Sequence, residues 1–361
     1  MPNKVLIAGA SGVVGAAAVE AFLADGWEVV ALSRRRPEIA HAKPYTHVAV
    51  DLRDAQASRA ALGALSGVTH VVYAALFEKP GLIAGWTERD QMQTNLAMLQ
   101  NCLAPLAGAG SSLRHVSLLQ GTKAYGIHLH PMPIPARERA PRDPHANFYW
   151  LQEDYLKELS AGRFAFTILR PQLIIGGAYG VAMNLAPVIG AYAAICRELG
   201  EPFAFPGGVS YVWEAVDARL LANVFVWASQ SPAAHGQHFN VTNGDVFEWR
   251  NVWPAMAATL GVAIGPDRPR ELKQFLPAHS AVWDRIVARH GLRQVAMPDL
   301  LGESHHYADF CFAYGASVPP PPAFVSAIKL RQAGFHEVCD SEQMFCHWLE
   351  NLIARGILPR A

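Results

Sequence analysis

Short apolar runs rich in β-branched residues alternate with longer Ala- and Leu-rich stretches through the first half of the chain. The short runs predict strands at residues 5–8, 29–32, 47–50, 69–75, 115–119 and 164–169. The longer stretches predict helices at residues 16–23, 57–65, 88–106 and from Phe148 onward. Strands without polar alternation are buried on both faces, which is typical of a parallel sheet covered by helices. The pattern predicts an α/β fold with a doubly wound parallel sheet.

The pattern changes after about residue 176, where prolines and tryptophans become frequent and helices dominate. One isolated strand is predicted at residues 238–242. The last helix begins at Asp340 or Ser341 as N-cap and places Phe345, Trp348 and Leu352 on one face. We expect a sheet domain at residues 1–176 and a smaller, mostly helical lobe at residues 177–361, with some segments of the lobe returning to the sheet domain.

A stretch without charged residues, 173–196, is long enough for a membrane span. Several glycines, Asn184 and Pro187 interrupt it, and a strand-like start precedes a helix-like end. We therefore interpret it as a strand end, a loop and a buried helix. The first residues contain no secretory signal, so we expect a cytoplasmic protein.

Composition narrows the function classes further. The chain has 361 residues, of which 51% are apolar and 17% charged, and its 30 Lys and Arg balance 30 Asp and Glu. The chain has no net charge and no stretch in which basic residues alternate with aromatic ones, so nucleic acid is not an expected partner. Five scattered cysteines form no C-x-x-C pair, which argues against a disulfide scaffold or a zinc knuckle.

A glycine-rich turn joins the first strand to the first helix. Gly9, Gly12 and Gly15 follow the spacing G-x-x-G-x-x-G, with Ser11 and Val13 between them. Gly9 allows the tight turn, Gly12 lets the backbone approach a pyrophosphate, and Gly15 permits close packing of the helix. The helix N-terminus then meets the phosphate charge. The turn predicts a dinucleotide site and a Rossmann-type sheet.

The end of the second strand favours NADPH over NADH. An acidic residue there would bind the ribose 2′-hydroxyl, but this chain has Ser33, Arg34 and Arg35. Guanidinium groups bind a 2′-phosphate through two hydrogen bonds at once. Two further pairs close the third and fourth strands and are expected beside the cofactor: Asp51, Leu52, Ala74 and Ala75.

The Tyr-x-x-x-Lys pair that short-chain dehydrogenases carry is absent from the helix after the fifth strand. That helix contains Tyr149, but the position four residues later is Glu153. A lysine, Lys123, lies instead just beyond the fifth strand. Both segments fall where the carboxyl ends of the strands of an open α/β sheet bind ligands.

This arrangement resembles the progesterone 5β-reductase/iridoid synthase-like family, an atypical branch of the short-chain dehydrogenase superfamily, over nearly the whole chain. The motifs that carry the resemblance are the glycine turn, Ser33-Arg34-Arg35, 121–125, Asn147-Phe148-Tyr149, Arg170-Pro171, 183–185, 192–196 and 239–247. The resemblance implies an NADPH-dependent reduction of the C=C bond of activated enones, with Tyr149 and Lys123 as the catalytic residues.

The chemistry of enone reduction suits these two residue types. Hydride addition to the β-carbon moves negative charge to the carbonyl oxygen, and a phenol hydroxyl at that oxygen stabilises the charge as it develops. We assign Tyr149 as the oxyanion donor and proton source, and Lys123 as its electrostatic partner or a cofactor contact.

We expect the nicotinamide between Tyr149 and the strand end 170–174, covered by residues 181–183. The further expected cofactor contacts are Gln120, Lys123, Tyr149, Pro171, Ile174, Val181, Ala182 and Met183. The expected substrate contacts are Trp86, His128 and Tyr307. The segments at 76–86 and 126–133 depart from the plant members, so steroid or terpenoid specificity is not implied.

Three other functions stay open from the residues: carbonyl reduction on the same scaffold, a nucleotide-sugar epimerase or dehydratase, and a non-catalytic NADPH sensor. The epimerase is disfavoured because it needs Tyr-x-x-x-Lys. His128 and His130, like His305 and His306, lack carboxylate or cysteine partners, so no metal site is expected. The expected partner is a small enone, enal or carbonyl compound. A homodimer is compatible with the sequence, which does not decide the oligomeric state.

Overall fold

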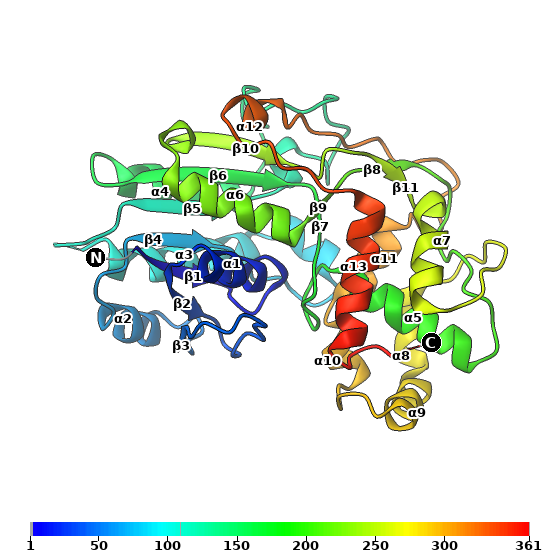
Figure 1. Cartoon of the computed structure of the whole chain (residues 1–361). Coiled ribbons are helices and arrows are strands. Elements are labelled where there is room, and N and C mark those ends of the chain that lie inside the picture. The colour runs from blue at the N-terminus through cyan, green and yellow to red at the C-terminus, as the bar shows by residue number, and fades with distance from the viewer. Residues whose placement is uncertain (1–2, 109, 361) are drawn as a thin grey trace.

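The computed structural model describes residues 3–108 and 110–360 of the chain. Seven strands form one sheet in the order β10-β6-β5-β4-β1-β2-β3, and each neighbouring pair is parallel (Figure 1). These strands are β1 (Lys4–Ala8), β2 (Glu28–Leu32), β3 (Thr46–Val48), β4 (His70–Tyr73), β5 (His115–Leu119), β6 (Ala165–Pro171) and β10 (Gln237–Val241). The prediction of a doubly wound parallel sheet is confirmed.

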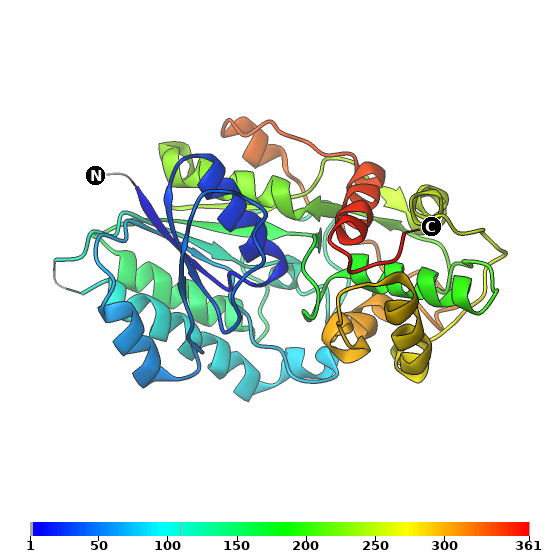
Figure 2. The same cartoon turned by 60° about the horizontal axis from the view of Figure 1, so that its bottom comes forward.

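Helices cover both faces of the sheet because both faces are apolar (Figure 2). Successive side chains of a strand point to opposite faces, so Val5 and Ile7 of β1 enter one core and Leu6 and Ala8 enter the other. The first core is covered by α1 (Val13–Ala24) and α6 (Ala218–Gln230). The second is covered by α2 (Ala55–Gly63), α3 (Arg89–Leu106) and α4 (Phe148–Ser160).

A separate apolar core holds together the helical lobe at the carboxyl ends of the strands. Its helices are α5 (Leu185–Glu198), α7 (Trp249–Leu260), α8 (Leu272–Ala278), α9 (Ser280–His290), α10 (Met297–Leu301), α11 (Ser304–Cys311) and α13 (Ser341–Ala354). Helix α5 runs through the middle of this lobe and is buried from Leu185 to Cys196, which explains why this stretch has no charges. Among the described residues, no helix combines the length and the apolarity that a membrane crossing requires.

Segments of the second half join the sheet. Strand β10 pairs in parallel with β6, with Phe239 opposite Leu169, so the strand predicted as isolated is an edge strand of the main sheet. Helix α6, which precedes β10, packs against α1. The remaining short elements are η1 (Leu82–Thr87), η2 (Thr122–Tyr125), β7 (Leu173–Ile175), β8 (Val212–Trp213), β9 (Ala215–Asp217), η3 (Pro232–Ala234), β11 (Phe247–Glu248) and α12 (Ile328–Gln332).

Candidate active site

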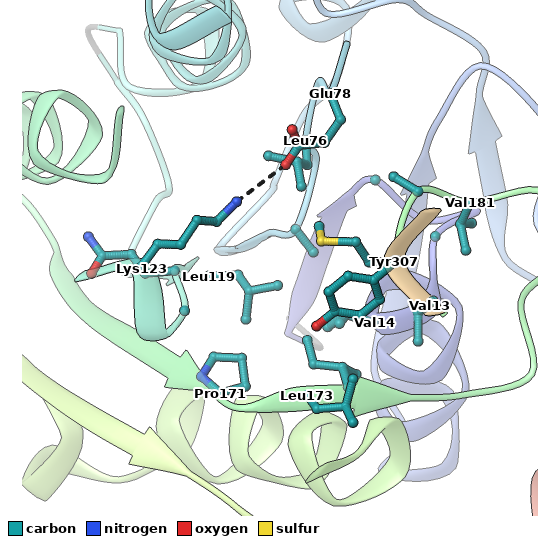
Figure 3. A pocket seen from close by; sticks show the side chains of 18 of the residues that line it. Val13, Val14, Leu76, Glu78, Leu119, Lys123, Pro171, Leu173, Val181 and Tyr307 are labelled. Carbon is teal, nitrogen blue, oxygen red and sulfur yellow. Dashed lines mark ion pairs between the residues drawn. The ribbon is translucent and has the colours of Figure 1, made fainter. Parts of the chain in front are cut away.

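A cavity of about 1080 Å³ lies at the carboxyl ends of the strands, between the sheet and the helical lobe. It is lined by all of the residues that the sequence analysis singled out for cofactor, catalysis or substrate, with the exception of Gly15. Figure 3 shows Lys123, Leu119 and Pro171 entering from the sheet side and Tyr307 entering from α11. The topology therefore brings residues from the whole length of the chain to one site.

The glycine turn between β1 and α1 forms one wall of the cavity. Gly9 adopts a φ of +82°, and a Cβ there would lie 2.7 Å from the backbone of Ala74 and Ala75 beyond β4. A Cβ on Gly15 would lie 2.1 Å from the carbonyl oxygen of Gly9. Gly15 therefore does not line the cavity, but its missing side chain lets α1 pack closely against the turn. The N-terminus of α1, capped by Gly12, opens onto the cavity.

The end of β2 presents two arginines to the same cavity. The Ser33 hydroxyl donates to the carbonyl oxygen of Arg35 at 2.6 Å, which folds the loop back toward the strand. Arg34 and Arg35 both line the cavity, and within residues 3–108 and 110–360 neither guanidinium has an ion-pair partner. Arg36, by contrast, lies over the ring of Tyr45 at 4.9 Å. Two cationic groups are thus free to meet an anion here.

The ends of β3 and β4 contribute the next part of the wall. Asp51 forms a 2.6 Å ion pair with Arg53, and hydrogen bonds from Arg53 hold the pKa of the Asp51 carboxyl below its usual value. Leu52 is buried beside it. Ala74 and Ala75 are the first two residues past β4, which ends at Tyr73 rather than at residue 75. Their small side chains leave room along the cavity floor.

Tyr149 lies in the first turn of α4 and is buried to 8% exposure. Asn147 caps this helix, and its side-chain oxygen accepts from the Tyr149 backbone N–H at 3.0 Å. Among the described residues the phenol hydroxyl has no hydrogen-bond partner, and it lies where a Cβ on Gly121 would be 3.1 Å away. Burial raises the pKa of this phenol, and the nearby Glu78 carboxylate adds to the rise. Tyr149 therefore offers an uncommitted proton to the cavity at neutral pH.

A polar network ties the helix of Tyr149 to the loop of Lys123. The side-chain amide of Asn147 donates to the Lys123 carbonyl oxygen at 3.2 Å and also lies 3.0 Å from Nε2 of His145. Nδ1 of His145 in turn lies 2.7 Å from the Asp143 carboxylate. The loop before α4 thus holds the backbone at both candidate catalytic residues through Asn147.

Lys123 has an acidic partner that sequence reasoning missed. Its Nζ lies 3.5 Å from Oε1 of Glu78, in the loop after β4, and 4.0 Å from the ring centre of Trp86. Figure 3 marks this ion pair at one side of the cavity. Burial lowers the pKa of the Lys123 ammonium, while Glu78 acts to raise it. In the sequence, Glu78 lies between the apolar residues 76–77 and 82–84, and a carboxylate in such surroundings is a signal for a buried partner.

Glu153 occupies the position where Tyr-x-x-x-Lys would place its lysine. Its carboxylate is buried beneath the site, where ion pairs link it to Arg142 and Lys157, and Nε2 of His238 lies 3.2 Å away. Burial alone would raise the pKa of Glu153, but the hydrogen bonds from these groups outweigh burial and hold the pKa well below its usual value. The residue therefore belongs to the support of α4.

Gln120 contacts the same support. Its side-chain amide donates to the Tyr149 carbonyl oxygen and to Glu153, both at 3.2 Å, while its oxygen accepts from Arg170 at 2.9 Å. Gln120 also lines the cavity at the end of β5. Its side chain is thus occupied in holding the helix of Tyr149.

One end of the cavity is lined by aromatic side chains. His128 lies edge-on to Trp86, with ring centres 6.4 Å apart, and burial lowers the pKa of His128 to about 4. Tyr307 stacks on Phe310, and burial raises the pKa of its phenol. The sequence analysis did not name several further lining residues: Tyr211, Trp213, Phe310, Tyr314, Pro320 and Pro321. In the part of the chain that the structure describes, no group of three metal-ligating side chains gathers.

Comparison with known proteins now places the chain. The sequence model of the NAD dependent epimerase/dehydratase family matches residues 5–242 of this chain. The chain belongs to this family. Its sequence is 30% identical to an (S)-8-oxocitronellyl enol synthase of Nepeta racemosa over 98% of this chain and 92% of that one. It is 29% identical to the 3-oxo-Delta(4,5)-steroid 5-beta-reductase of Arabidopsis thaliana with the same coverage of the two chains. The resemblance inferred from the sequence motifs is confirmed.

Solved structures of other proteins share the fold. The Bordetella bronchiseptica enzyme WbmH in complex with NAD+ superposes with a TM-score of 0.67 at 17% identity, covering 98% of this chain and 99% of that one. The UDP-glucose 4-epimerase of Bifidobacterium longum, in complex with NAD+ and UDP, gives a TM-score of 0.66 at 14% identity, again with 98% and 99% coverage. This family member is an oxidoreductase of the short-chain dehydrogenase type with a nicotinamide-binding fold.

Proposed function

We propose that this protein is an NADPH-dependent reductase of activated C=C bonds in enones or enals. The observation that carries the proposal is the free phenol hydroxyl of Tyr149, which shares one buried cavity with the Lys123 ammonium and the glycine turn. The Arabidopsis relative is named as a reductase of a 3-oxo-Delta(4,5)-steroid, which is a conjugated enone. The departures at 76–86 and 126–133 keep the substrate of this chain open within that class.

The residues of the cavity fit a nicotinamide dinucleotide phosphate. The turn at Gly9 and Gly12 has no side chain to block a pyrophosphate, and the N-terminus of α1 favours negative charge. Arg34 and Arg35 would bind the 2′-phosphate. When bound, the cofactor supplies the hydride, and we propose that Tyr149, the strand end 170–174 and residues 181–183 surround its nicotinamide.

The reaction needs charge stabilisation at the substrate carbonyl oxygen. As hydride adds to the β-carbon, negative charge grows on that oxygen, and the Tyr149 hydroxyl donates to it. The raised pKa of Tyr149 keeps this proton in place until an oxyanion develops. The Lys123 ammonium contributes positive charge inside the same apolar enclosure, where electrostatic interactions are less screened than in water. The enolate then takes a proton from solvent at the α-carbon, which re-forms the carbonyl group and completes the saturated product.

The absence of the Tyr-x-x-x-Lys arrangement separates this site from sugar epimerases that depend on it. Glu153, at the lysine position, is held beneath the site by cationic partners. Lys123 instead enters the cavity from the segment after β5, and we propose that the cavity beside Tyr149 takes an apolar substrate. The aromatic end of the cavity favours such a substrate over a nucleotide sugar.

The decisive experiment incubates the purified protein with NADPH and a panel of enones, enals, aldehydes and ketones, and identifies products by mass spectrometry. We expect saturated carbonyl products. Alcohols with an intact C=C bond would instead assign carbonyl reduction, in which Tyr149 protonates an alkoxide. NADPH binding without turnover of any compound would identify a non-catalytic sensor.

A further inference from the structure

The buried Glu78 and Lys123 side chains form an isolated pair on the substrate side of the cavity. Their side chains are 3% and 15% exposed, and Glu78 Oε1 lies 3.5 Å from Lys123 Nζ. The indole of Trp86 covers the ammonium at 4.0 Å from the ring centre. Taking a charge out of water is unfavourable by several kcal/mol unless an opposite charge compensates it. Burial raises the pKa of Glu78 and lowers the pKa of Lys123, and the charge of each partner opposes the shift of the other, so each favours the charged state of its neighbour.

The loop that carries Glu78 is built to hold its carboxylate in place. Gln91, at the start of α3, donates from its side-chain amide to Glu78 Oε2 at 2.6 Å. The oxygen of the same amide accepts from the Lys79 backbone N–H at 3.0 Å. Gln91 is itself 1% exposed. With Oε2 occupied in this way, Oε1 is left to face Lys123.

The other titratable groups at this end of the cavity do not replace Glu78. His128 is neutral at pH 7 because burial lowers its pKa to about 4, and burial raises the pKa values of the Tyr149 and Tyr307 phenols. The remaining charged or titratable groups near Lys123 and these neighbours are Asp143, His145, His130, Arg170 and Asp309. Asp143 is engaged by two histidines, and Asp309 accepts from backbone N–H groups at the start of α8.

We propose that Glu78 is a positioning residue that keeps Lys123 cationic and directed across the cavity. The proposal rests on the proposed function only for what the Lys123 charge does to a substrate. Without the Glu78 carboxylate, burial of the ammonium beside Trp86 would lower the pKa of Lys123 further, and the site would lose its positive charge at a lower pH. The relevant carboxylate lies in the 76–86 turn, so this part of the site is set by a loop in which the chain departs from the plant members.

The state of Lys123 can be measured without any substrate. Only a neutral amine reacts with a small acylating reagent, so the pH dependence of Lys123 acetylation, followed by peptide mass spectrometry from about pH 6 to 10, reports its protonation. In Glu78→Gln we expect the midpoint to fall by about 1–3 pH units, the usual effect of an opposite charge at this range. The amide of Gln can still accept from Gln91, so the loop is expected to stay in place.

Two further variants keep the test sharp. Glu88→Gln removes a half-buried carboxylate at the end of the same loop, where it pairs with Lys79, and is expected to leave the Lys123 midpoint unchanged. Glu78→Asp retains the charge but retracts it by one methylene, so its midpoint should lie between those of the parent and Glu78→Gln. If Glu78→Gln does not fold, a lowered midpoint in Glu78→Asp supports the proposal. An unchanged or raised midpoint in the folded Glu78 variants overturns it.

Activity provides an independent second readout. If the parent reduces an enone, the alkaline limb of its kcat/KM profile should move to lower pH in Glu78→Gln by the shift that the labelling measures. A parent protein that reduces nothing would contradict the proposed function, while the labelling would still decide whether Glu78 holds the charge of Lys123.

Discussion

At the carboxyl ends of the strands, Lys123, Glu78 and the Tyr149 hydroxyl face a cavity of about 1080 Å³. At the amino ends of β4 and β5, two histidines, His70 and His115, line a second, smaller cavity of about 600 Å³ and belong to a cluster of rings. Their ring centres lie 6.2 Å apart, and His235 lies 5.5 Å beyond His115. Both ends of the sheet therefore bury titratable groups, but they do so in different chemical states.

The histidines at the amino ends are neutral and tied to neighbouring hydroxyls. His70 Nδ1 lies 2.8 Å from Thr69 Oγ1, and His115 Nε2 lies 2.9 Å from Thr167 Oγ1. Burial lowers the pKa of His70 to about 4 and that of His115 to about 3. At the carboxyl ends, by contrast, a lysine and a carboxylate are enclosed together, and a phenol has no hydrogen-bond partner within residues 3–108 and 110–360. Neutral, hydrogen-bonded burial at the amino ends fits a structural role, whereas the free donor beside an enclosed ion pair at the carboxyl ends fits the proposed chemistry.

The largest expected effect follows from removing the free donor. Tyr149→Phe keeps the ring and its packing but deletes the hydroxyl, and loss of one oxyanion donor lowers kcat by about 10²–10³-fold, or about 3–4 kcal/mol. We expect NADPH affinity and stability to stay at parental values, since the phosphate contacts lie elsewhere. Single-turnover kinetics on a weakly activated enone measure the effect.

The companion variant Lys123→Ala should also slow turnover. Combined with Tyr149→Phe it should cost less than the sum of the single effects, because residues that act as a unit are not additive. Parental turnover by Tyr149→Phe, with the chemical step rate-limiting, would remove Tyr149 from the mechanism.

A second prediction concerns the cationic end of the same cavity. Arg34→Ala with Arg35→Ala should weaken NADPH binding and leave NADH binding unchanged, because each charge-assisted hydrogen-bonded pair contributes about 1.5–3 kcal/mol. Calorimetric titration with each cofactor measures this. Arg36→Ala is the matched control, since Arg36 lies over Tyr45. Equal affinity of the parent protein for NADPH and NADH would contradict the assignment of these arginines.

A third prediction tests whether the glycine turn serves both fold and site. In Gly15→Ala the added Cβ meets the Gly9 carbonyl oxygen at 2.1 Å, so α1 must move away from the turn. We expect a loss of about 1–3 kcal/mol in the free energy of unfolding, together with weaker cofactor binding. Urea unfolding and NADPH titration provide the two measurements. Gly63→Ala is the control, because a Cβ there has nothing within 4 Å. It should reduce neither the free energy of unfolding nor the affinity for NADPH.

The smallest effect is expected at the amino ends of the strands. Between its unfolded pKa of 6.5 and its folded pKa of about 4, His70 takes up a proton only in the unfolded chain, so stability falls as the pH falls through this window. One unit below the unfolded pKa, at about pH 5.5, the loss is about 1.4 kcal/mol. Urea unfolding at this pH and at about pH 7.5 should show a smaller loss in His70→Gln than in the parent.

The exposed His336 provides a control for this pH dependence. His336→Gln should retain the parental loss of stability. If His70→Gln shows the full parental loss as well, His70 does not bury a neutral ring in the way described, and the contrast between the two ends of the sheet weakens.

Much of the fold was readable from local pattern. The apolar runs located the six strands β1 to β6, because strands buried on both faces need continuous apolar sequence. Ala74 and Ala75 were placed inside a strand that ends at Tyr73, since small apolar residues continue the pattern past the last backbone pairing. Strand β10 was recognised without its place, because its partner β6 lies far away in sequence. Local periodicity does not report such pairing.

In the candidate site, too, some features follow from local sequence and others from tertiary packing. The sequence by itself determined the glycine turn, the arginines after β2 and the positions of Tyr149 and Lys123, because these depend on local spacing relative to strand ends. Only the tertiary structure decided that Glu78 faces Lys123 and that Glu153 turns beneath the site to Arg142. A charged side chain selects its partner by distance and shared burial after the elements have packed, and neither quantity is encoded in the order of residues near it.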